Sequence, residues 1–209
     1  MQRATHWNQA YGEGDESRSW FQAEPATSLR LIEAAGADPA APLLDAGGGA
    51  ARLVDALLAR GFCDLTVADV SSAAMDLARQ RLGPAASRVA WIEAELARWT
   101  PPRRYALWHD RAAFHFLTDP GEQDGYIAAL RAGTPPGAAA IIGGFALEGP
   151  ERCSGLPVMR WAPEALAARI GAPFVLEHAE TELHVTPAGR EQRFAWAVLR
   201  RKERSSQPL

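Results

Sequence analysis

An acid followed by three glycines is the part of the sequence with the clearest chemistry. Asp45 ends a short apolar run that begins at Leu43, and Gly47 and Gly49 lie in the turn that follows, ahead of a helical pattern. This layout of strand, glycine turn and helix start is typical of sites where a nucleotide-like ligand lies against the backbone. A carboxylate at such a turn repels phosphates. The expected ligand therefore carries an adenosine and positive charge, with no phosphate.

Two phosphate-binding patterns are missing from this turn. The dinucleotide pattern G-x-G-x-x-G needs a third glycine at position 52, where the chain has Arg52. The pattern G-x-x-x-x-G-K-[ST] needs a lysine, and Lys202 is the only lysine in the sequence. S-adenosylmethionine carries an ammonium and a sulfonium and has no phosphate. It is the expected cofactor, with S-adenosylhomocysteine as the product.

Two further acids follow strand-like runs at positions that suit the same ligand. Asp69 ends the second run, where a carboxylate can accept hydrogen bonds from both ribose hydroxyls, and Val70 adjoins it as a further cofactor contact. Glu95 follows the third run and can accept from an adenine amino group, while Leu96 offers its backbone N–H. Glu93 competes with Glu95 for this role, because the sequence does not fix the last residue of the strand.

Strand-like runs alternate with helical patterns along most of the chain. The runs are 43–46, 65–68, 89–92, 105–108, 138–145, 174–183 and 193–199, and the helical patterns are 25–35, 50–60, 72–82, 94–99, 122–133 and 163–170. The alternation predicts an α/β fold, a doubly wound, mostly parallel seven-stranded sheet with helices on both faces. No helix separates the last two runs, so a C-terminal hairpin with an antiparallel strand at or near the edge is expected.

The run 108–117 places two histidines, an acid, an arginine and several aromatic rings at the end of the fourth strand. Methyl transfer from a sulfonium mainly requires a positioned acceptor, and it needs a base only when the acceptor arrives protonated. His115 is the candidate base. Asp110 can orient His109 or Arg111, hold an amine acceptor or contact the cofactor. The structural alternative is an Asp110–Arg111 ion pair with the aromatic rings in the core.

The segment from Asp45 to Ala51 resembles the first motif, D-x-G-x-G-x-G, of the class I, Rossmann-like S-adenosylmethionine-dependent methyltransferases, with Ala51 in place of the last glycine. Asp69 matches the ribose-binding acid of that family. Glu95 and Leu96 match its adenine-binding position, where aspartate is more usual. The resemblance implies that Asp45, Gly47, Gly49, Asp69 and Glu95 bind the cofactor, and it implies the family's reversed final strand.

The resemblance covers about residues 40–200, within a single domain expected over 1–200. Residues 1–40 are expected to form an N-terminal lid or helical segment, with Trp20 folded over the cofactor because aromatic faces favour a sulfonium. The alternative is that these aromatic residues only pack a helix onto the sheet. Residues 146–162 are the expected acceptor loop, and 201–209 read as a flexible tail.

Composition and charge exclude several other classes. The formal net charge of −3 argues against a general nucleic-acid binder. The N-terminus has no apolar signal core, and the longest nearly apolar run, 138–147, is too short to span a bilayer. Cys63 and Cys153 do not have a zinc-site spacing. We therefore expect a cytoplasmic monomer or homodimer with no metal, nucleic-acid or membrane partner.

The leading hypothesis is an enzyme that moves a methyl group from S-adenosylmethionine to a small-molecule acceptor, at a nitrogen, oxygen or sulfur that the sequence leaves open. Some single-domain members of the family methylate protein lysines, so a protein side chain is the first alternative. A nicotinamide-dependent oxidoreductase, which Arg52 and Asp45 disfavour, and a non-catalytic nucleotide-binding module are the alternatives from other classes.

Overall fold

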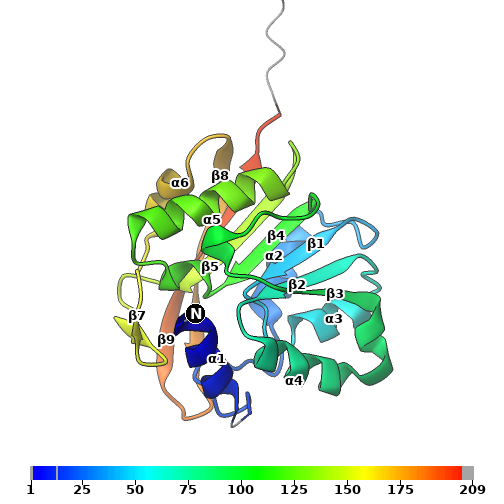
Figure 1. Ribbon diagram of the computed structural model, residues 1–209. Helices are drawn as coiled ribbons and strands as arrows, with labels where there is room; N and C mark the ends of the chain where they lie inside the picture. The colour runs from blue at the N-terminus through cyan, green and yellow to red at the C-terminus, as the bar shows by residue number, and fades with distance from the viewer. Residues whose placement is uncertain (1, 13, 204–209) are drawn as a thin grey trace, which may run out of the picture.

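The computed structural model describes residues 2–12 and 14–203, and a seven-stranded sheet forms its centre (Figure 1). The strands lie in the order β3-β2-β1-β4-β5-β9-β8. In chain order they are β1 (Leu43–Ala46), β2 (Leu65–Asp69), β3 (Val89–Glu93), β4 (Leu107–Arg111), β5 (Ala139–Phe145), β8 (Phe174–Val185) and β9 (Glu191–Arg201). The strands from β3 to β5 pair in parallel, whereas β9 runs antiparallel to both β5 and β8. The predicted mostly parallel sheet with a C-terminal hairpin is confirmed.

Helices cover both faces of this sheet, as expected. They are α1 (Gln2–Tyr11), α2 (Ala26–Ala34), α3 (Leu53–Ala59), α4 (Ser72–Leu82), α5 (Pro120–Gly133) and α6 (Pro163–Ile170). Successive side chains of a strand point to opposite faces. Leu43 accordingly joins the buried cluster with α2 and α3, and Leu44 joins the cluster with α5 and α6, which lie toward the viewer in Figure 1. Burial on both faces explains why the strands read as continuous apolar runs.

Side-chain caps define where two of the helices begin. Ser71 accepts a hydrogen bond of 3.1 Å from the N–H of Ala74 and caps α4, whose bounds match the predicted 72–82. Asp119 accepts one of 3.1 Å from the N–H of Glu122, so α5 begins at Pro120, earlier than the predicted 122. Proline suits that first turn because its missing N–H has no helical partner there. The predicted 94–99 helix is only a short 3₁₀ turn, η2 (Leu96–Arg98).

The prediction was wrong about the bounds of the fourth strand and about the last strand's end. The fourth strand was predicted at 105–108 but runs as β4 over Leu107–Arg111, because its polar side chains find partners inside the protein. Similarly, Arg200 and Arg201 belong to β9, so the predicted tail at 201–209 begins later. Residues 204–209 of that tail lie outside the described residues.

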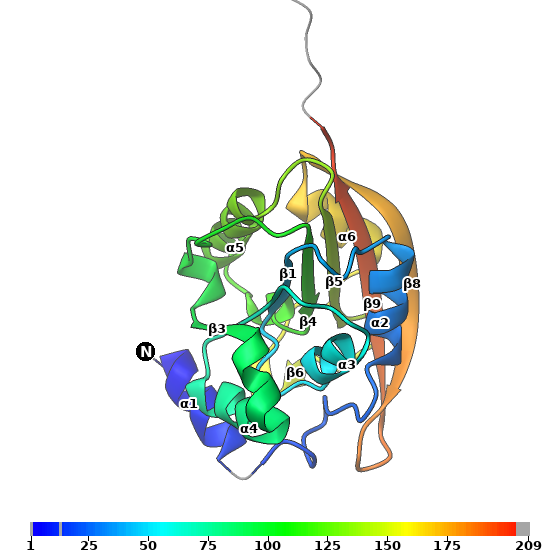
Figure 2. The ribbon, with the colours of Figure 1, turned by 90° about the vertical axis from the view of Figure 1, so that its right-hand side faces the viewer.

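One small element near the predicted site was not anticipated, whereas helix α1 falls within residues 1–40, where a lid or helical segment was expected. The segment 146–162 contains the short hairpin β6 (Arg152–Cys153) and β7 (Leu156–Pro157). Helix α1 lies beside α4 (Figure 2), where Asn8 Oδ1 accepts hydrogen bonds from Ser71 Oγ at 2.8 Å and from the N–H of Ala73 at 3.2 Å. Of the described helices, none combines the length and the apolar character needed to cross a membrane.

Candidate active site

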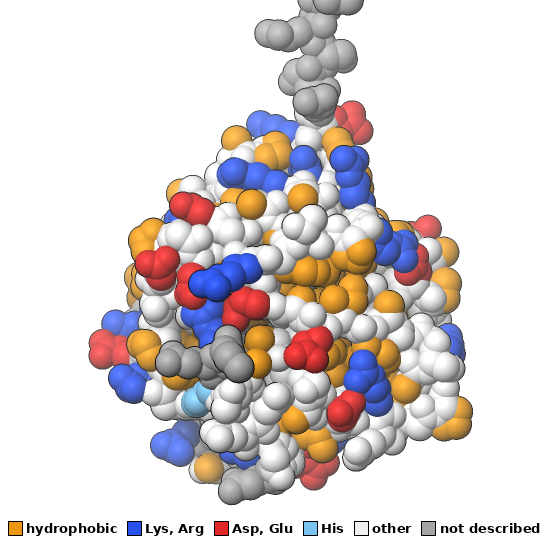
Figure 3. Space-filling model, viewed as in Figure 1, with side chains coloured by type: hydrophobic (Ala, Val, Ile, Leu, Met, Phe, Trp, Pro, Cys, Tyr) orange, Lys and Arg blue, Asp and Glu red, His pale blue; other side chains and the backbone are white. Residues whose placement is uncertain are grey.

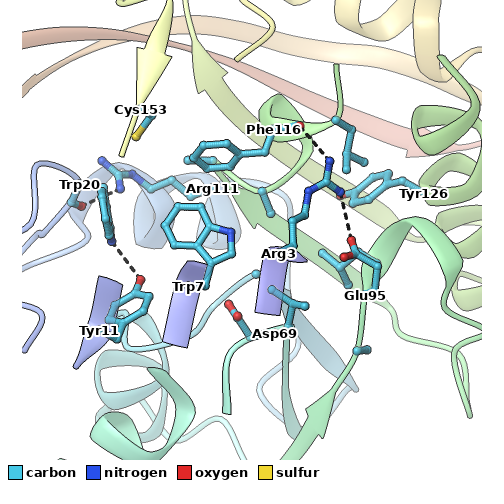
Figure 4. A pocket seen from close by; sticks show the side chains of 17 residues that line it. Arg3, Trp7, Tyr11, Trp20, Asp69, Glu95, Arg111, Phe116, Tyr126 and Cys153 are labelled. Carbon is cyan, nitrogen blue, oxygen red and sulfur yellow. Dashed lines mark hydrogen bonds and ion pairs between the residues drawn. The ribbon is translucent and has the colours of Figure 1, made fainter. Parts of the chain in front are cut away.

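Two adjoining cavities lie at the carboxyl ends of β1, β2 and β4, and Figure 4 shows the side chains that line the first of them. The first has a volume of about 760 Å³ and the second about 600 Å³. Tyr11, Trp20, Gly47 and Arg111 line both of them, so the two cavities meet along these side chains. This end of an open α/β sheet is where ligands bind.

The glycine turn after β1 forms the floor between the cavities. Gly47 has φ +74°, and a Cβ built on it would lie 2.4 Å from the Cβ of Ala113. Only glycine lets the turn after β1 pass so close to the turn after β4. Gly49 has φ +43°, and its Cβ would lie 3.0 Å from Asp69 Oδ2. Gly47 therefore lines the site directly, and Gly49 leaves room for the neighbouring carboxylate.

Asp45 sits at the end of β1 and lines the second cavity. Its Oδ1 atom lies 2.8 Å from His109 Nδ1, and His109 Nε2 lies 2.9 Å from Ser28 Oγ. The Oδ2 atom of Asp45 is buried and has no partner among the described residues. The structure thus bonds one oxygen of this carboxylate inside the protein and leaves the other without a partner among the described residues.

Asp69 and Val70 line the first cavity at the end of β2. The N–H of Ser71 donates to Asp69 Oδ1 at 2.7 Å, which orients the carboxylate. Burial, reinforced by the negative charges of Asp45 and Glu95, raises the pKa of the Asp69 carboxyl to about 7. A cationic or donor-rich partner at this cavity would stabilise the ionised form of the Asp69 carboxyl.

Glu95, and not its competitor Glu93, lines the first cavity, together with Leu96. Glu93 is exposed at the end of β3. Glu95 Oε1 lies 3.2 Å from Nη1 of Arg3, whose Nη2 lies 2.6 Å from Glu122 Oε2. Arg3 therefore ties helix α1 to the predicted adenine side of the site, because it contacts both Glu95 and Glu122.

One face of α1 closes the first cavity. Arg3, Trp7 and Tyr11 are spaced four residues apart, which puts them on one side of a helix, and all three line the cavity. Trp7 lies in the middle of the site in Figure 4 and packs edge-on against Phe116, with ring centroids 4.9 Å apart. The predictions named none of these three as site residues, although the four-residue spacing was the signal that could have found them.

Trp20, which was predicted to contact the cofactor, lines both cavities. Its Nε1 donates to the hydroxyl of Tyr11 at 3.0 Å, and its ring packs edge-on against Trp7 at 5.7 Å. The N-terminal aromatic residues therefore cover the site and also pack on one another, which combines the two alternatives drawn from the sequence.

Asp110 does not line either cavity, and the suggested ion pair with Arg111 does not form. The two residues are neighbours on β4, so their side chains point to opposite faces. The Asp110 carboxylate accepts from Tyr126 Oη at 2.7 Å and from the N–H of Ala113 at 2.9 Å. Burial raises its pKa to about 6. In this geometry Asp110 fixes the turn after β4 and touches neither ligand space.

His115 is also enclosed behind the cavity wall. The N–H of Phe145 approaches its Nδ1 at 3.4 Å, and Nε2 is buried with no partner among the described residues. Burial and the charge of Arg111 lower its pKa to about 3, so its imidazole is neutral and weakly basic. Of the three predicted catalytic residues, only His109 lines a cavity, and both of its ring nitrogens already have partners.

Arg111 lies where the two cavities meet, and the sequence reading gave it no role toward a ligand. Its Nη1 donates to the carbonyl of Trp20 at 3.0 Å, and its guanidinium carbon lies 4.4 Å from the ring centroid of Phe194. The next residue, Ala112, lines the first cavity with φ +67°, a strained conformation for a residue with a side chain. The Cys153 thiol also lines the cavity, and burial raises its pKa to about 11.

In the part of the chain that the structure describes, no cluster of three or more histidine, cysteine or acidic side chains is arranged to hold a metal ion. On the face viewed in Figure 3, acidic and basic side chains are interspersed.

A family model described as a methyltransferase domain matches residues 43–137. That range runs from β1 to the start of β5 and contains the glycine turn, Asp69 and Glu95. Over residues 43–137 the chain is therefore similar to a methyltransferase domain, and its seven-stranded sheet has the fold of the class I, S-adenosylmethionine-dependent methyltransferases. Among curated proteins, no sequence matches the chain.

Solved structures with the same fold cover nearly the whole chain. An S-adenosylmethionine-dependent methyltransferase from Anabaena variabilis is 15% identical, with a TM-score of 0.75 and coverage of 97% of this chain and 96% of that one. The N-methyltransferase NodS from Bradyrhizobium japonicum, in complex with S-adenosylhomocysteine, is 16% identical, with a TM-score of 0.72 and coverage of 96% and 100%. The 1,6-didemethyltoxoflavin-N1-methyltransferase from Burkholderia thailandensis is 19% identical, with a TM-score of 0.69 and coverage of 97% and 90%.

Proposed function

We propose that this enzyme binds S-adenosylmethionine across both cavities and transfers its methyl group to a small-molecule acceptor. The observation that carries the proposal is the line of acids at three neighbouring strand ends, Asp45, Asp69 and Glu95. The Oδ2 atom of Asp45 is orphaned, and Asp69 and Glu95 face the first cavity. Such a row suits a cationic adenosyl compound and repels a phosphate-bearing one.

Each acid has a part of the cofactor that it fits. The free oxygen of Asp45 lies at the second cavity and suits the ammonium of the methionine end. Asp69, with Val70 beside it, accepts from the ribose hydroxyls, and Glu95 with Leu96 takes the adenine. Gly47 gives the backbone approach that this ligand needs. When bound, S-adenosylmethionine supplies an activated methyl group on a sulfonium.

The rest of the first cavity is the proposed acceptor space. It is lined by Trp7, Trp20, Phe116, Arg111 and Cys153, from α1, the loop after it, the turn after β4 and hairpin β6–β7. Walls on these sides favour a small molecule over a protein side chain. The Burkholderia structure holds 1,6-didemethyltoxoflavin together with S-adenosylhomocysteine, which supports an acceptor of that size.

Catalysis in this proposal depends on positioning. None of the described residues that line the first cavity is a histidine, and the enclosed aromatic walls exclude water and hold the acceptor near the sulfonium. His109 and Asp110 act as positioning residues, the first by fixing Asp45 and the second by fixing the turn that carries Ala113. The cytoplasmic location and the oligomeric state remain predictions.

Calorimetric titration with S-adenosylhomocysteine tests the cofactor assignment, with Gly47→Ala and Gly36→Ala as a matched pair. Both glycines have φ +74°, but a Cβ at Gly36 meets nothing within 4 Å, whereas one at Gly47 meets Ala113 at 2.4 Å. Both variants should lose about 1 kcal/mol of stability from the backbone conformation. Only Gly47→Ala should also lose affinity for the cofactor, because the turn after β4 must move.

A screen across amine, phenol, thiol and carboxylate acceptors and lysine peptides, read by S-adenosylhomocysteine release, tests the acceptor class. Turnover of small molecules without turnover of peptides is the expected result. Tight NADH binding with no response to S-adenosylhomocysteine would contradict the proposal. Binding of S-adenosylhomocysteine without any turnover would instead favour the non-catalytic module.

A further inference from the structure

The guanidinium of Arg111 has a free edge at the junction of the two cavities. Its Nη1 is engaged by the Trp20 carbonyl, but Nε and Nη2 are buried with no partner among the described residues. Nε and Nη2 form one side of the arginine fork, whose two parallel N–H groups match the two oxygens of a carboxylate. A buried guanidinium edge without an acceptor is costly, which points to a ligand that completes it.

Glu182, the acid whose charge acts on Arg111, does not fill this role. Glu182 acts on Arg111 only through its charge. Its Oε1 accepts from Gln22 Nε2 at 2.8 Å, and its Oε2 accepts from Trp196 Nε1 at 2.8 Å. Burial lowers the pKa of Arg111, yet arginine stays protonated at neutral pH. The site therefore keeps a positive charge that the surrounding protein does not pair directly.

The head of Arg111 belongs to the acceptor side of the cavity. In Figure 4 it lies with Trp20 and Cys153, on the other side of Trp7 from Glu95. It stacks on Phe194 of β9 and interacts electrostatically with Cys153 of β6. These neighbours lie outside residues 43–137, the range of the methyltransferase domain match, which holds the proposed cofactor acids.

We infer that Arg111 is a specificity-determining residue that binds a carboxylate on the acceptor, so the substrate is a carboxylate-bearing, partly aromatic or apolar small molecule. This inference rests on the proposed function, because it takes the ligand of Arg111 to be the methyl acceptor. The rings of Trp7, Trp20 and Phe116 supply the apolar contacts, and the Nε–Nη2 edge supplies the single charged anchor.

The first experiment measures binding of benzoate and benzamide to the protein saturated with S-adenosylhomocysteine. Benzoate should bind the wild type about tenfold or more tightly than benzamide, the scale of one charge-assisted hydrogen-bonded pair. Arg111→Met should remove that preference, and Arg111→Lys should keep only part of it because a lysine lacks the fork. Arg103→Met, which removes a surface arginine paired with Asp64, is the charge-matched control and should change nothing.

Equal binding of benzoate to the wild type and to Arg111→Met would overturn the inference, as would equal binding of benzoate and benzamide or no binding of benzoate at all. Because the acid–amide comparison uses the wild type, it does not depend on how well a variant folds. A companion screen of acceptor acids against their primary amides should show turnover of the acids and a loss of about a hundredfold or more in kcat/KM for the amides.

A carboxylate also occurs at the methionine end of the cofactor, and a second pair of ligands separates the two sources. Arg111→Met should bind S-adenosylhomocysteine within about threefold of the wild type, a change of less than one charge-assisted hydrogen bond. A large loss for S-adenosylhomocysteine but not for its decarboxylated analogue would assign the guanidinium to the cofactor and overturn the acceptor assignment. If the wild type binds no S-adenosylhomocysteine, the proposed function fails, while benzoate binding to the free protein still tests the anion subsite.

Discussion

Asp45 on β1 and His109 on β4 are direct register partners, and their side chains meet in a 2.8 Å hydrogen bond between Oδ1 and Nδ1. Ser28 of α2 lies 2.9 Å from the other ring nitrogen of His109, so three elements are joined by one buried chain of polar groups. These hydrogen bonds orient the Asp45 carboxylate and leave its second oxygen without a partner among the described residues. A carboxylate preorganised in this way binds a cation without first having to change its orientation.

Asp45→Asn should weaken binding of S-adenosylhomocysteine by about 1.5–3 kcal/mol, the scale of a hydrogen bond to a charged group. The amide keeps the size of the side chain but loses the negative charge that attracts the ammonium. Isothermal titration calorimetry measures the change. Asp64→Asn, which neutralises a surface acid paired with Arg103, is the control and should leave the affinity unchanged. An Asp45→Asn variant with wild-type affinity would remove Asp45 from the site.

The part of the site that could be predicted consists of residues recognised from short local segments of the sequence, at or just after the ends of strands. Asp45 and Asp69 lie in the last residues of β1 and β2, and Gly47 and Glu95 follow β1 and β3 closely, so the parallel topology alone brings them to one edge. Partners distant in the sequence were not predictable in this way. Ser28 approaches His109 across 81 residues, and only packed coordinates show that a histidine taken for a catalytic group is already bonded at both nitrogens.

Asp69 should make the stability of the ligand-free protein fall as the pH rises. Burial raises its pKa to about 7, above the value of about 3.9 for an unfolded aspartate. Between these values the folded state binds more protons than the unfolded state, so stability decreases from about pH 4 to pH 7. Asp69→Asn removes this contribution to the pH dependence of stability. The Tm of the variant minus that of the wild type should be near zero at pH 4 and positive at pH 8.

The same substitution should cost cofactor affinity, since the ionised carboxylate accepts from two ribose hydroxyls. Asp69→Asn should bind S-adenosylhomocysteine more weakly by about 1–3 kcal/mol. Wild-type affinity should rise as the pH increases through about 7, whereas the variant's affinity should be flat. Asp76→Asn, which changes an exposed aspartate of α4 paired with Arg79, serves as the control. A Tm difference that did not vary with pH would show that Asp69 is not buried as described.

Asn8 should control how firmly the lid helix is held. Its Oδ1 atom accepts from both Ser71 and Ala73 at the start of α4, and Asn8→Ala leaves those donors unpaired. We expect a loss of about 1–2 kcal/mol in stability, similar to the loss of a helix cap, and faster dissociation of S-adenosylhomocysteine. Gln9→Ala changes an exposed neighbour on the same helix and should affect neither. Stopped-flow displacement and thermal unfolding measure the two effects, and equal dissociation rates in both variants would argue against a lid.

The lid also shows what local sequence patterns miss. The first 24 residues are polar with scattered aromatic residues, a composition that allowed a lid or a helical segment without fixing the bounds of a helix. Contacts with residues distant in the sequence hold the helix in place. Arg3 bridges Glu95 and Glu122, which lie on different elements of the domain. An ion-pair bridge of this kind depends on the tertiary fold, whereas the spacing of Arg3, Trp7 and Tyr11 was visible in the sequence.

His115 should not govern the pH dependence of turnover. With its pKa lowered to about 3 by burial and by Arg111, it is neutral throughout the range in which the enzyme can be assayed. At saturating S-adenosylmethionine, kcat should follow the pKa of the acceptor itself, so two acceptors of different pKa should give profiles displaced by that difference. His115→Asn, which keeps an acceptor for the N–H of Phe145, should retain the wild-type profile for each. An inflection near pH 6–7 that disappears in His115→Asn would instead identify His115 as the general base, and the imidazole would then have to gain access to the cavity during turnover.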